Sequence, residues 1–147
     1  MSNAPHSVAQ RCINWPAAQA VVSAACVAAE TQGLRINTAV VDAGGMLVAF
    51  LRMPGAYLHS SDIAVDKAYT AAGFGLPTSA WTEALATHSL AVRDGLPRRP
   101  RFVAFGGGLP IVEDGVLIGA IGVSGGSESQ DEACARAGLQ ALDLADA

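Results

Sequence analysis

Two apolar stretches, residues 109–113 and 116–124, are separated by Asp114-Gly115. An Asp-Gly pair between apolar runs is the strongest short-range signal for a hairpin, because a type I′ turn needs a positive φ at both central positions. The sequence therefore predicts an antiparallel hairpin here. A fold for this chain has to include an antiparallel sheet.

The remaining patterns predict helices and further strands around this hairpin. Helical spacing of small apolar residues, with glycines as stop signals, indicates the helices, and short aliphatic runs indicate the strands. The stretch from Arg93 to Arg101 holds two prolines and four arginines and is expected to be an exposed loop. The expected elements are a helix over residues 8–32, strands over 35–42 and 46–52, a helix capped by Ser60 or Ser61 and running to about residue 72, a short helix over 78–91, strands over 102–105, 109–113 and 116–124, and a final helix after Ser127, which has capping-box spacing with Gln130.

Runs of strands bracketed by helices are typical of the α+β class. We therefore expect an antiparallel sheet of about five strands flanked by helices. With 147 residues the chain is the size of one domain, so a single domain over residues 1–147 is expected, with residues 1–7 flexible.

Charge and hydropathy exclude several classes of partner. The formal net charge is −4, so the chain lacks the basic footprint of proteins that bind nucleic acid or anionic membranes. The start of the sequence does not resemble a secretory leader, and no window approaches 18 uninterrupted apolar residues. We expect a cytoplasmic protein with no nucleic-acid or membrane partner.

The composition is apolar but poor in aromatic residues. Hydrophobic residues make up 51% of the chain, whereas aromatic residues make up 5% and charged residues 15%. Much of the apolar content is alanine, with 16 glycines beside it, which favours layers that approach closely. The apolar surface that one small domain cannot bury predicts subunit interfaces.

Lys67 and Arg52 are the two cations that call for an explanation. Lys67 is the only lysine, and the spacing of Ile63, Ala64 and Ala71 places it on the apolar stripe of its helix. It either extends to water or pairs with a carboxylate, or it binds an acid group or acts as a catalytic lysine. Arg52 ends a predicted strand, where it either forms an ion pair with Asp42 or Asp62, or binds a ligand carboxylate.

Two glycine clusters are candidates for backbone contact with an anionic ligand. Gly106, Gly107 and Gly108 precede a strand, and Gly125 and Gly126 directly precede the last helix, whose N-terminus favours anions. The alternative interpretation is tight turns and close helix–sheet packing. Neither cluster has the spacing of a nucleotide-binding glycine motif.

Acidic residues, histidines and cysteines give weaker signals. Asp42, at a strand end, and His59 are candidates to move a proton, and His59 is also a candidate haem ligand or an exposed loop residue. Asp131 falls in the first turn of the last helix, where it complements the helix dipole. The histidines show no metal-ligand spacing, so no metal site is predicted. The three cysteines are expected to be reduced structural thiols.

Taken together, several segments resemble the GlcG/HbpS family, which also includes the C-terminal domain of PduO-type adenosyltransferases. The resemblance extends from about residue 15 to 142, and its most specific part is the run from Ile118 to Gly126 with the preceding GGGLPI. The segments that carry it are Val41-Asp42-x-Gly44-Gly45, Arg52-Met53-x-Gly55-Ala56, Ala64-x-x-Lys67-Ala68-x-Thr70-Ala71, Pro77-Thr78, Gly106-Gly107-Gly108-Leu109-Pro110-Ile111, and Ile118 to Gly126 followed by Asp131.

The resemblance implies a single α-β-α layered domain that assembles into homo-oligomers, from dimers to octamers. It also implies haem as a candidate cofactor and a place in a catabolic operon. The positions that match a family pocket are Arg52, Lys67, Gly106, Gly107, Gly108, Gly125 and Gly126. His59 departs from the pattern.

Two functions compete. The first is a module that binds a small anionic ligand, haem or another tetrapyrrole, with propionates on Arg52, Arg35 or the arginine loop and an axial ligand from His59, His88 or a methionine. The second is an enzyme, a lyase, isomerase or hydrolase, that acts on a small carboxylic acid. In that enzyme Arg52 and Lys67 bind the acid, and His59 or Asp42 moves a proton.

Overall fold

The computed structural model describes residues 3–144. Residues 1–2 of the predicted flexible N-terminus lie outside the described part. The elements are α1 (Trp15–Thr31), β1 (Asn37–Asp42), β2 (Leu47–Arg52), α2 (His59–Phe74), η1 (Thr78–Ala80), α3 (Trp81–Ala86), α4 (Leu90–Gly95), η2 (Leu96–Arg98), β3 (Gly108–Glu113), β4 (Val116–Ser124) and α5 (Glu128–Gln140).

The four strands form one antiparallel sheet with the order β2-β1-β4-β3. The predicted hairpin between β3 and β4 is confirmed, and its turn residues Asp114 and Gly115 have φ angles of 52° and 76°. The two hairpins join through β1 and β4, which are therefore the central strands. The antiparallel α+β class is confirmed.

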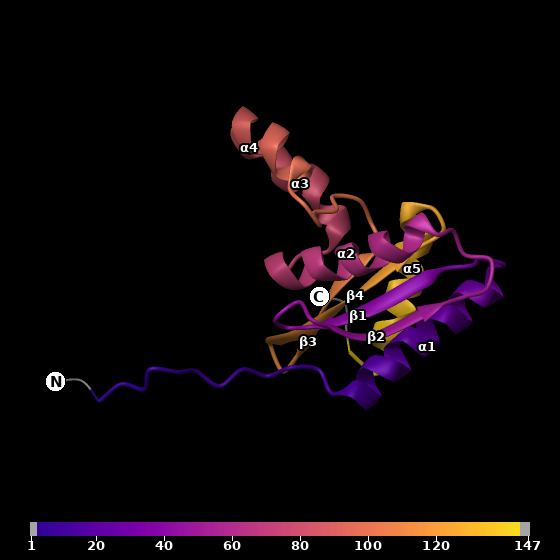
Figure 1. The fold of residues 1–147 in the computed structure, drawn as a ribbon, viewed down its shortest axis with the longest axis horizontal. Coiled ribbons are helices and arrows are strands. Elements are labelled where there is room, and N and C mark those ends of the chain that lie inside the picture. The colour runs from indigo at the N-terminus through magenta and orange to yellow at the C-terminus, as the bar shows by residue number, and fades with distance from the viewer. Residues whose placement is uncertain (1–2, 145–147) are drawn as a thin grey trace.

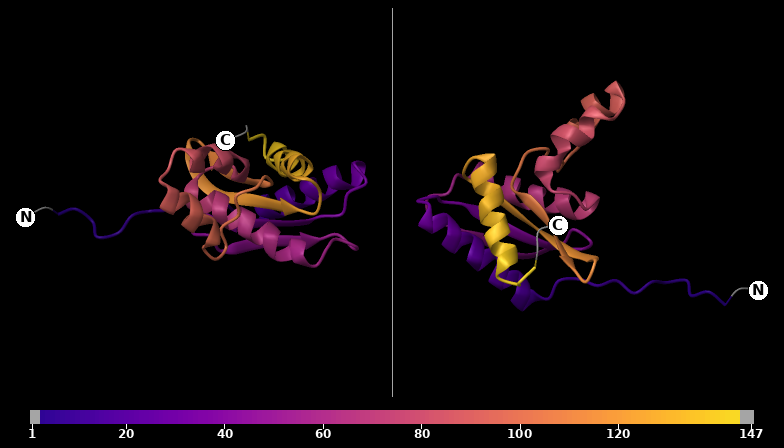
Figure 2. Two further views of the ribbon diagram at one scale, coloured as in Figure 1. Left: turned by 90° about the horizontal axis from the view of Figure 1, so that it is seen from above. Right: turned by 180° about the vertical axis from the view of Figure 1, so that it is seen from behind.

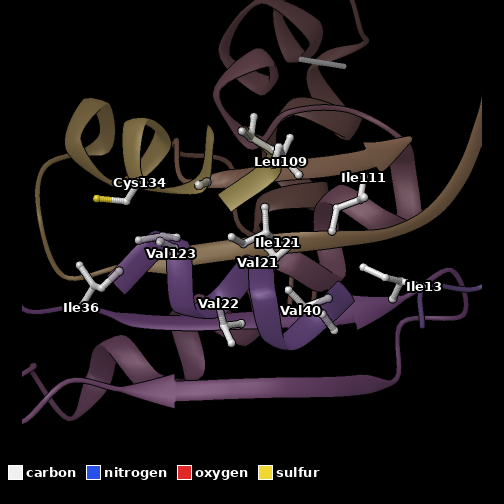
Figure 3. Packing of buried hydrophobic residues seen from close by; sticks show 14 of the residues in the cluster. Ile13, Val21, Val22, Ile36, Val40, Leu109, Ile111, Ile121, Val123 and Cys134 are labelled. Atoms are coloured by element: carbon white, nitrogen blue, oxygen red, sulfur yellow. The ribbon is translucent and has the colours of Figure 1, made fainter. Parts of the chain in front are cut away.

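Helices cover both faces of the sheet. α1 and α5 lie side by side on one face, and α2 covers the other face (Figure 1 and Figure 2). The larger core lies under α1 and α5, where side chains such as Val21, Ile111 and Ile121 are fully buried (Figure 3). Among residues 3–144, no helix is both long and apolar enough to cross a membrane.

On the opposite face α2 packs very closely against the sheet. A Cβ on Gly122 would overlap the backbone of Ala64, and a Cβ on Gly108 would lie 2.6 Å from the carbonyl oxygen of Lys67. The small core here contains mainly alanines together with Val41. Glycine and alanine thus take the place of large side chains between α2 and the sheet, as the composition predicts.

The first helix begins at Trp15 and not at Val8. Pro16 lacks the N–H that a helix interior needs, and its ring would clash with the preceding turn, so it is tolerated only in the first turn. Residues 3–14 form no helix or strand. The N–H of Ile13 donates to the carbonyl oxygen of Ile118 at 2.8 Å and Arg11 pairs with Glu113, and the chain before Arg11 extends away from the sheet (Figure 1).

The predicted strand over residues 102–105 does not form, so the sheet has four strands and not about five. Phe102 instead packs edge-on against Phe74 and Trp81, with ring centroids 5.8 and 4.9 Å away. The N–H of Val103 donates to the hydroxyl of Thr70 at 3.1 Å and not to a strand.

The segment between α2 and β3 also differs from the prediction. The short helix expected over residues 78–91 divides into η1, α3 and α4, and η2 lies inside the expected arginine loop. Together α3 and α4 stand away from the sheet (Figure 1). α2 itself begins at His59, with no side-chain cap from Ser60 or Ser61. It ends at Phe74, and the C-cap residue Gly75 has a φ of 68°.

Candidate functional site

Lys67 lies on the buried stripe of α2, as predicted, and is 1% exposed. Its Nζ donates to Oδ2 of Asp131 at 2.9 Å and to the carbonyl oxygen of Val123 at 2.8 Å. The same ammonium lies 5.1 Å from the ring centroid of Phe105. Three contacts from three segments therefore surround the three N–H donors of Lys67.

Asp131 completes this buried pair from the first turn of α5. Its Oδ1 accepts a hydrogen bond from the N–H of Gly126 at 2.8 Å. Burial raises the pKa of Asp131 and lowers the pKa of Lys67, while the attraction between the two charges opposes both shifts. The pair joins α2 to α5 and holds the loop between β4 and α5 in place.

The triple glycine makes its polar contacts within the protein. The N–H of Gly106 donates to Oε1 of Glu128, and the N–H of Gly108 donates to Oγ1 of Thr78, both at 2.8 Å. A Cβ on Gly107 would lie 2.7 Å from Nζ of Lys67. The absence of a side chain at Gly107 therefore leaves room for the buried pair beneath the triple-glycine loop. The N–H groups of Gly106 and Gly108 already donate hydrogen bonds within the protein.

Arg52 shapes a second loop. It lies opposite Asn37 at the end of β2, and its Nη2 donates to the carbonyl oxygen of Ala56 at 2.8 Å. Asn37 donates through Nδ2 to the carbonyl oxygen of Tyr57 at 3.1 Å. Both side chains position the loop over residues 53–58, which leads into α2.

Asp42 lies at the other end of β1. Its Oδ1 accepts hydrogen bonds from the N–H groups of Gly44 and Met46, at 2.9 and 3.1 Å, so it stabilises the β1–β2 turn. Five residues of strand, about 16 Å, separate it from Asn37 and hence from Arg52. It is not brought together with the cations.

His59 is the first residue of α2 and is exposed. The enzyme hypothesis needs it close to Arg52, Lys67 and Asp42. The structure encloses Lys67 in its own buried ion pair and places Asp42 in a distant turn. In this arrangement Lys67 and Asp42 are each occupied by contacts within the protein.

A groove lies where β1 begins and β2 ends, and we call it the Arg35 groove. It has a volume of about 680 Å³, within the size range of small-molecule sites. A smaller recess of about 240 Å³ continues from it toward Tyr57 and Gly125. The residues that line the groove are Cys26, Val27, Glu30, Gly33, Leu34, Arg35, Met53, Pro54 and Gly55.

Two glycines make room for Arg35. A Cβ on Gly55 would overlap the Arg35 guanidinium, and a Cβ on Gly125 would lie 2.5 Å from the Arg35 carbonyl oxygen. Within residues 3–144 the Arg35 side chain has no carboxylate partner. The groove therefore combines apolar walls with one unpaired cation.

Sequence reasoning included Arg35 only as one of several cations and missed Cys26, Met53 and Tyr57. The available signal was a pair of glycines, Gly33 and Gly55, each close in sequence to an arginine. Of the predicted pocket residues, Gly125 lines the recess and Arg52 positions the wall. Gly126 and Lys67 do not line the groove, and both donate hydrogen bonds to Asp131.

Comparison with known proteins gives matches over nearly the whole chain. Residues 13–140 match the family described as "Haem degrading protein HbpS-like". An uncharacterized 15.0 kDa protein from the dhaT-dhaS intergenic region of Citrobacter freundii is 40% identical over 116 residues, which cover 76% of this chain and 82% of the relative.

Solved structures show the same fold. The Klebsiella pneumoniae protein ORFY superposes with a TM-score of 0.88 at 32% identity, over 99% of this chain and all of that one. A PduOC–haem complex superposes with a TM-score of 0.84 at 30% identity, over 92% of this chain and 98% of that one.

Proposed function

Because the chain belongs to the HbpS-like family, we propose that it binds haem, or another tetrapyrrole, in the Arg35 groove. The observation that carries this assignment is the groove itself, about 680 Å³ of mainly apolar lining with the unpaired guanidinium of Arg35. The solved PduOC–haem complex supports haem as the tetrapyrrole.

The groove residues fit the two chemical requirements of a haem. Its apolar macrocycle needs walls such as those supplied by Val27, Leu34 and Pro54. Its propionates need a cation, and Arg35 presents a planar guanidinium suited to carboxylates. The carboxylate of Glu30 also lines the groove and repels propionates, so the binding orientation places them on the side of Arg35.

The axial ligand is drawn from a short set of side chains. Met53 lines the groove, Tyr57 lines the recess, and thioether and phenolate groups both ligate haem iron in proteins. Burial, and then Glu30, raise the pKa of Cys26, so its sulfur stays a thiol and is disfavoured as a ligand. We assign Met53 as the ligand, with exposed His59 as the alternative.

In this arrangement the bound group would supply redox-active iron. The protein's own residues would hold and orient it. Arg52 and Asn37 fix the loop that forms one wall, and Asp131 fixes the loop beside the recess. Arg52, Lys67 and the glycine clusters therefore act on the ligand through backbone position.

Titration of the purified protein with hemin tests the proposal. We expect a Soret shift that saturates at one hemin per chain. Arg35→Ala should weaken binding at least tenfold, because a charged hydrogen bond is lost. Arg98→Ala, in the exposed η2 segment, is the matched control and should bind like the wild type. A spectrum that does not shift or saturate would overturn the proposal.

The choice of Met53 as the axial ligand is tested separately, by the positions of the haem absorption bands. Met53→Leu keeps the volume of the side chain and removes the sulfur, so it should move the Soret and visible bands while binding persists. His59→Ala should leave the bands unchanged. The opposite pattern would make His59 the ligand.

We also propose that the chain forms a homo-oligomer. Several large apolar side chains on α1 and β2 are exposed, including Trp15 at 67% and Leu47 at 53%. Light scattering coupled to size-exclusion chromatography should give a multiple of the 14.9 kDa chain mass. A 15 kDa particle would contradict this.

A further inference from the structure

A second, smaller cavity, which we call the α2 cavity, lies between the C-terminal half of α2 and residues 96–102. Its volume is about 160 Å³, and apolar surface dominates its lining. Its position at Tyr69 is about 15 Å along α2 from His59, so it is separate from the Arg35 groove. The lining residues are Tyr69, Thr70, Gly73, Phe74, Leu96, Arg99, Pro100, Arg101 and Phe102.

Arg101 is held rigidly at one wall of this cavity. It has a φ of 66°, a left-handed conformation that costs energy for residues other than glycine. Its Nε lies 3.1 Å from Oδ1 of Asp66, and its guanidinium stacks 3.6 Å from the centroid of the Tyr69 ring. The buried hydroxyl of Thr70 donates to its carbonyl oxygen at 2.9 Å. Three contacts and one strained backbone position thus define the wall.

Arg99 differs from Arg101 in having a free guanidinium. Among the described residues, 3–144, it has no ion pair and its side chain has no hydrogen bond. No acidic residue lines the cavity among residues 3–144, and Asp66 is already paired with Arg101. An apolar cavity with one unpaired cation is complementary to an anion that has an apolar body.

Trp81 packs behind two of the residues that line the cavity. Trp81 packs edge-on against Phe74 and Phe102, with ring centroids at 4.7 and 4.9 Å, and both phenylalanines line the cavity. The indole is 4% exposed, and its Nε1 has no hydrogen-bond partner in the described part of the chain. Trp81 itself does not line the cavity, so its indole can report on the cavity through its contacts with these two rings.

We propose that the α2 cavity binds a compact monocarboxylate with an apolar body of about one six-membered ring. The carboxylate pairs with Arg99, and the apolar body lies among Leu96, Phe74 and Phe102. Aromatic side chains in the lining favour a flat apolar group. This site is independent of haem binding in the Arg35 groove.

Trp81 supplies the signal for the test. The other tryptophan, Trp15, is 67% exposed, so the variant Trp15→Phe makes the fluorescence report on Trp81 alone. Benzoate is the probe, and benzamide is the neutral probe of the same shape. We expect a saturable fluorescence change with benzoate and at least tenfold weaker binding of benzamide.

Matched variants in the Trp15→Phe background locate the carboxylate. Arg99→Ala should weaken benzoate binding at least tenfold, whereas Arg98→Ala, one residue away and outside the lining, should not. Arg35→Ala should keep the benzoate response, which separates this site from the groove. Absence of a saturable response, or equal affinity of the Arg99→Ala and Arg98→Ala variants, would overturn the proposal.

Discussion

The single lysine of the chain is a structural cation whose partner is distant in sequence. Lys67 and Asp131 are 64 residues apart, and both are nearly fully buried. A buried charge is tolerated only when it is paired and hydrogen-bonded, and here both conditions are met. The pair therefore specifies how α5 sits relative to α2.

Replacing one member of the Lys67–Asp131 pair should lower the free energy of unfolding far more than replacing both members. Lys67→Met leaves Asp131 buried without its cation and should lower the free energy of unfolding by about 3–5 kcal/mol. The double variant Lys67→Met with Asp131→Leu should recover a large part of that loss. Urea unfolding of Lys67→Met, Asp131→Leu and the double variant measures the coupling, and strictly additive losses would contradict the assignment.

The cysteines should react in the order of their exposure. Cys12 is exposed, Cys26 is half-buried and Cys134 is buried, and burial raises the pKa of Cys134 to about 11. At pH 8 iodoacetamide should therefore modify Cys12 first and Cys134 last, as mass spectrometry of the digest can show. Fast modification of Cys134 would contradict its placement.

The same shift predicts a pH dependence of stability. The folded protein keeps the Cys134 proton up to about pH 11, whereas the unfolded chain loses it near 9.0. Stability from this group is therefore complete below pH 9 and decreases as the pH rises toward 11. Cys134→Ala should remove this part of the alkaline loss in thermal unfolding.

At the scale of elements, the spacing between α2 and the sheet is set by glycine. Gly122 faces the backbone of Ala64, with no room for a Cβ. Gly73 also belongs to α2, but nothing lies within 4 Å of the position that its Cβ would take. We therefore expect the fold to be sensitive to an added side chain at Gly122 and to tolerate one at Gly73.

Alanine at these two positions should therefore act in opposite directions. Gly122→Ala should destabilise the fold by about 1–3 kcal/mol or more, because α2 must move off the sheet. Gly73→Ala should stabilise it by about 0.5–1 kcal/mol through helix propensity. Denaturation midpoints of the two variants provide the comparison, and a harmless Gly122→Ala would contradict the close packing.

Local signals predicted most elements, and tertiary contacts explain the failures. The Asp114-Gly115 turn and the Ser127–Gln130 capping box are local devices, and both form as predicted. The segment over residues 102–105 reads as a strand, but packing of Phe102 on Trp81 and Phe74 decides its structure. Those contacts lie across 20 or more residues and leave no pattern in a short window.

The distinction between local signals and tertiary contacts also explains what the sequence predicted about the site. The helical stripe placed Lys67 in the buried face correctly, because helical spacing is local. Its pairing with Asp131, and the gathering of Arg35, Met53 and Tyr57 around one groove and recess, depend on the joining of β1, β2 and β4. Strand order is not visible in sequence spacing, so Arg35 could not be ranked above the other arginines.

At the scale of the whole molecule, more surface is exposed than a chain of this size needs. The accessible surface is 8228 Å², against roughly 7,000 Å² for a compact monomer of this mass. The excess comes with the extended N-terminal segment and with α3 and α4, which stand away from the sheet (Figure 1). α3 and α4 are six residues each, too short to be stable alone.

Blocking the Arg35 groove is a direct test of whether haem binds there. Val27 lines the groove from α1 and is 63% exposed, so Val27→Trp fills the groove without disturbing the core. Val92→Trp places the same side chain on α4, outside the groove, and is the control. In hemin titrations we predict that Val27→Trp loses the saturable Soret shift and Val92→Trp keeps it. Wild-type hemin binding by a folded Val27→Trp variant would contradict haem binding in this groove.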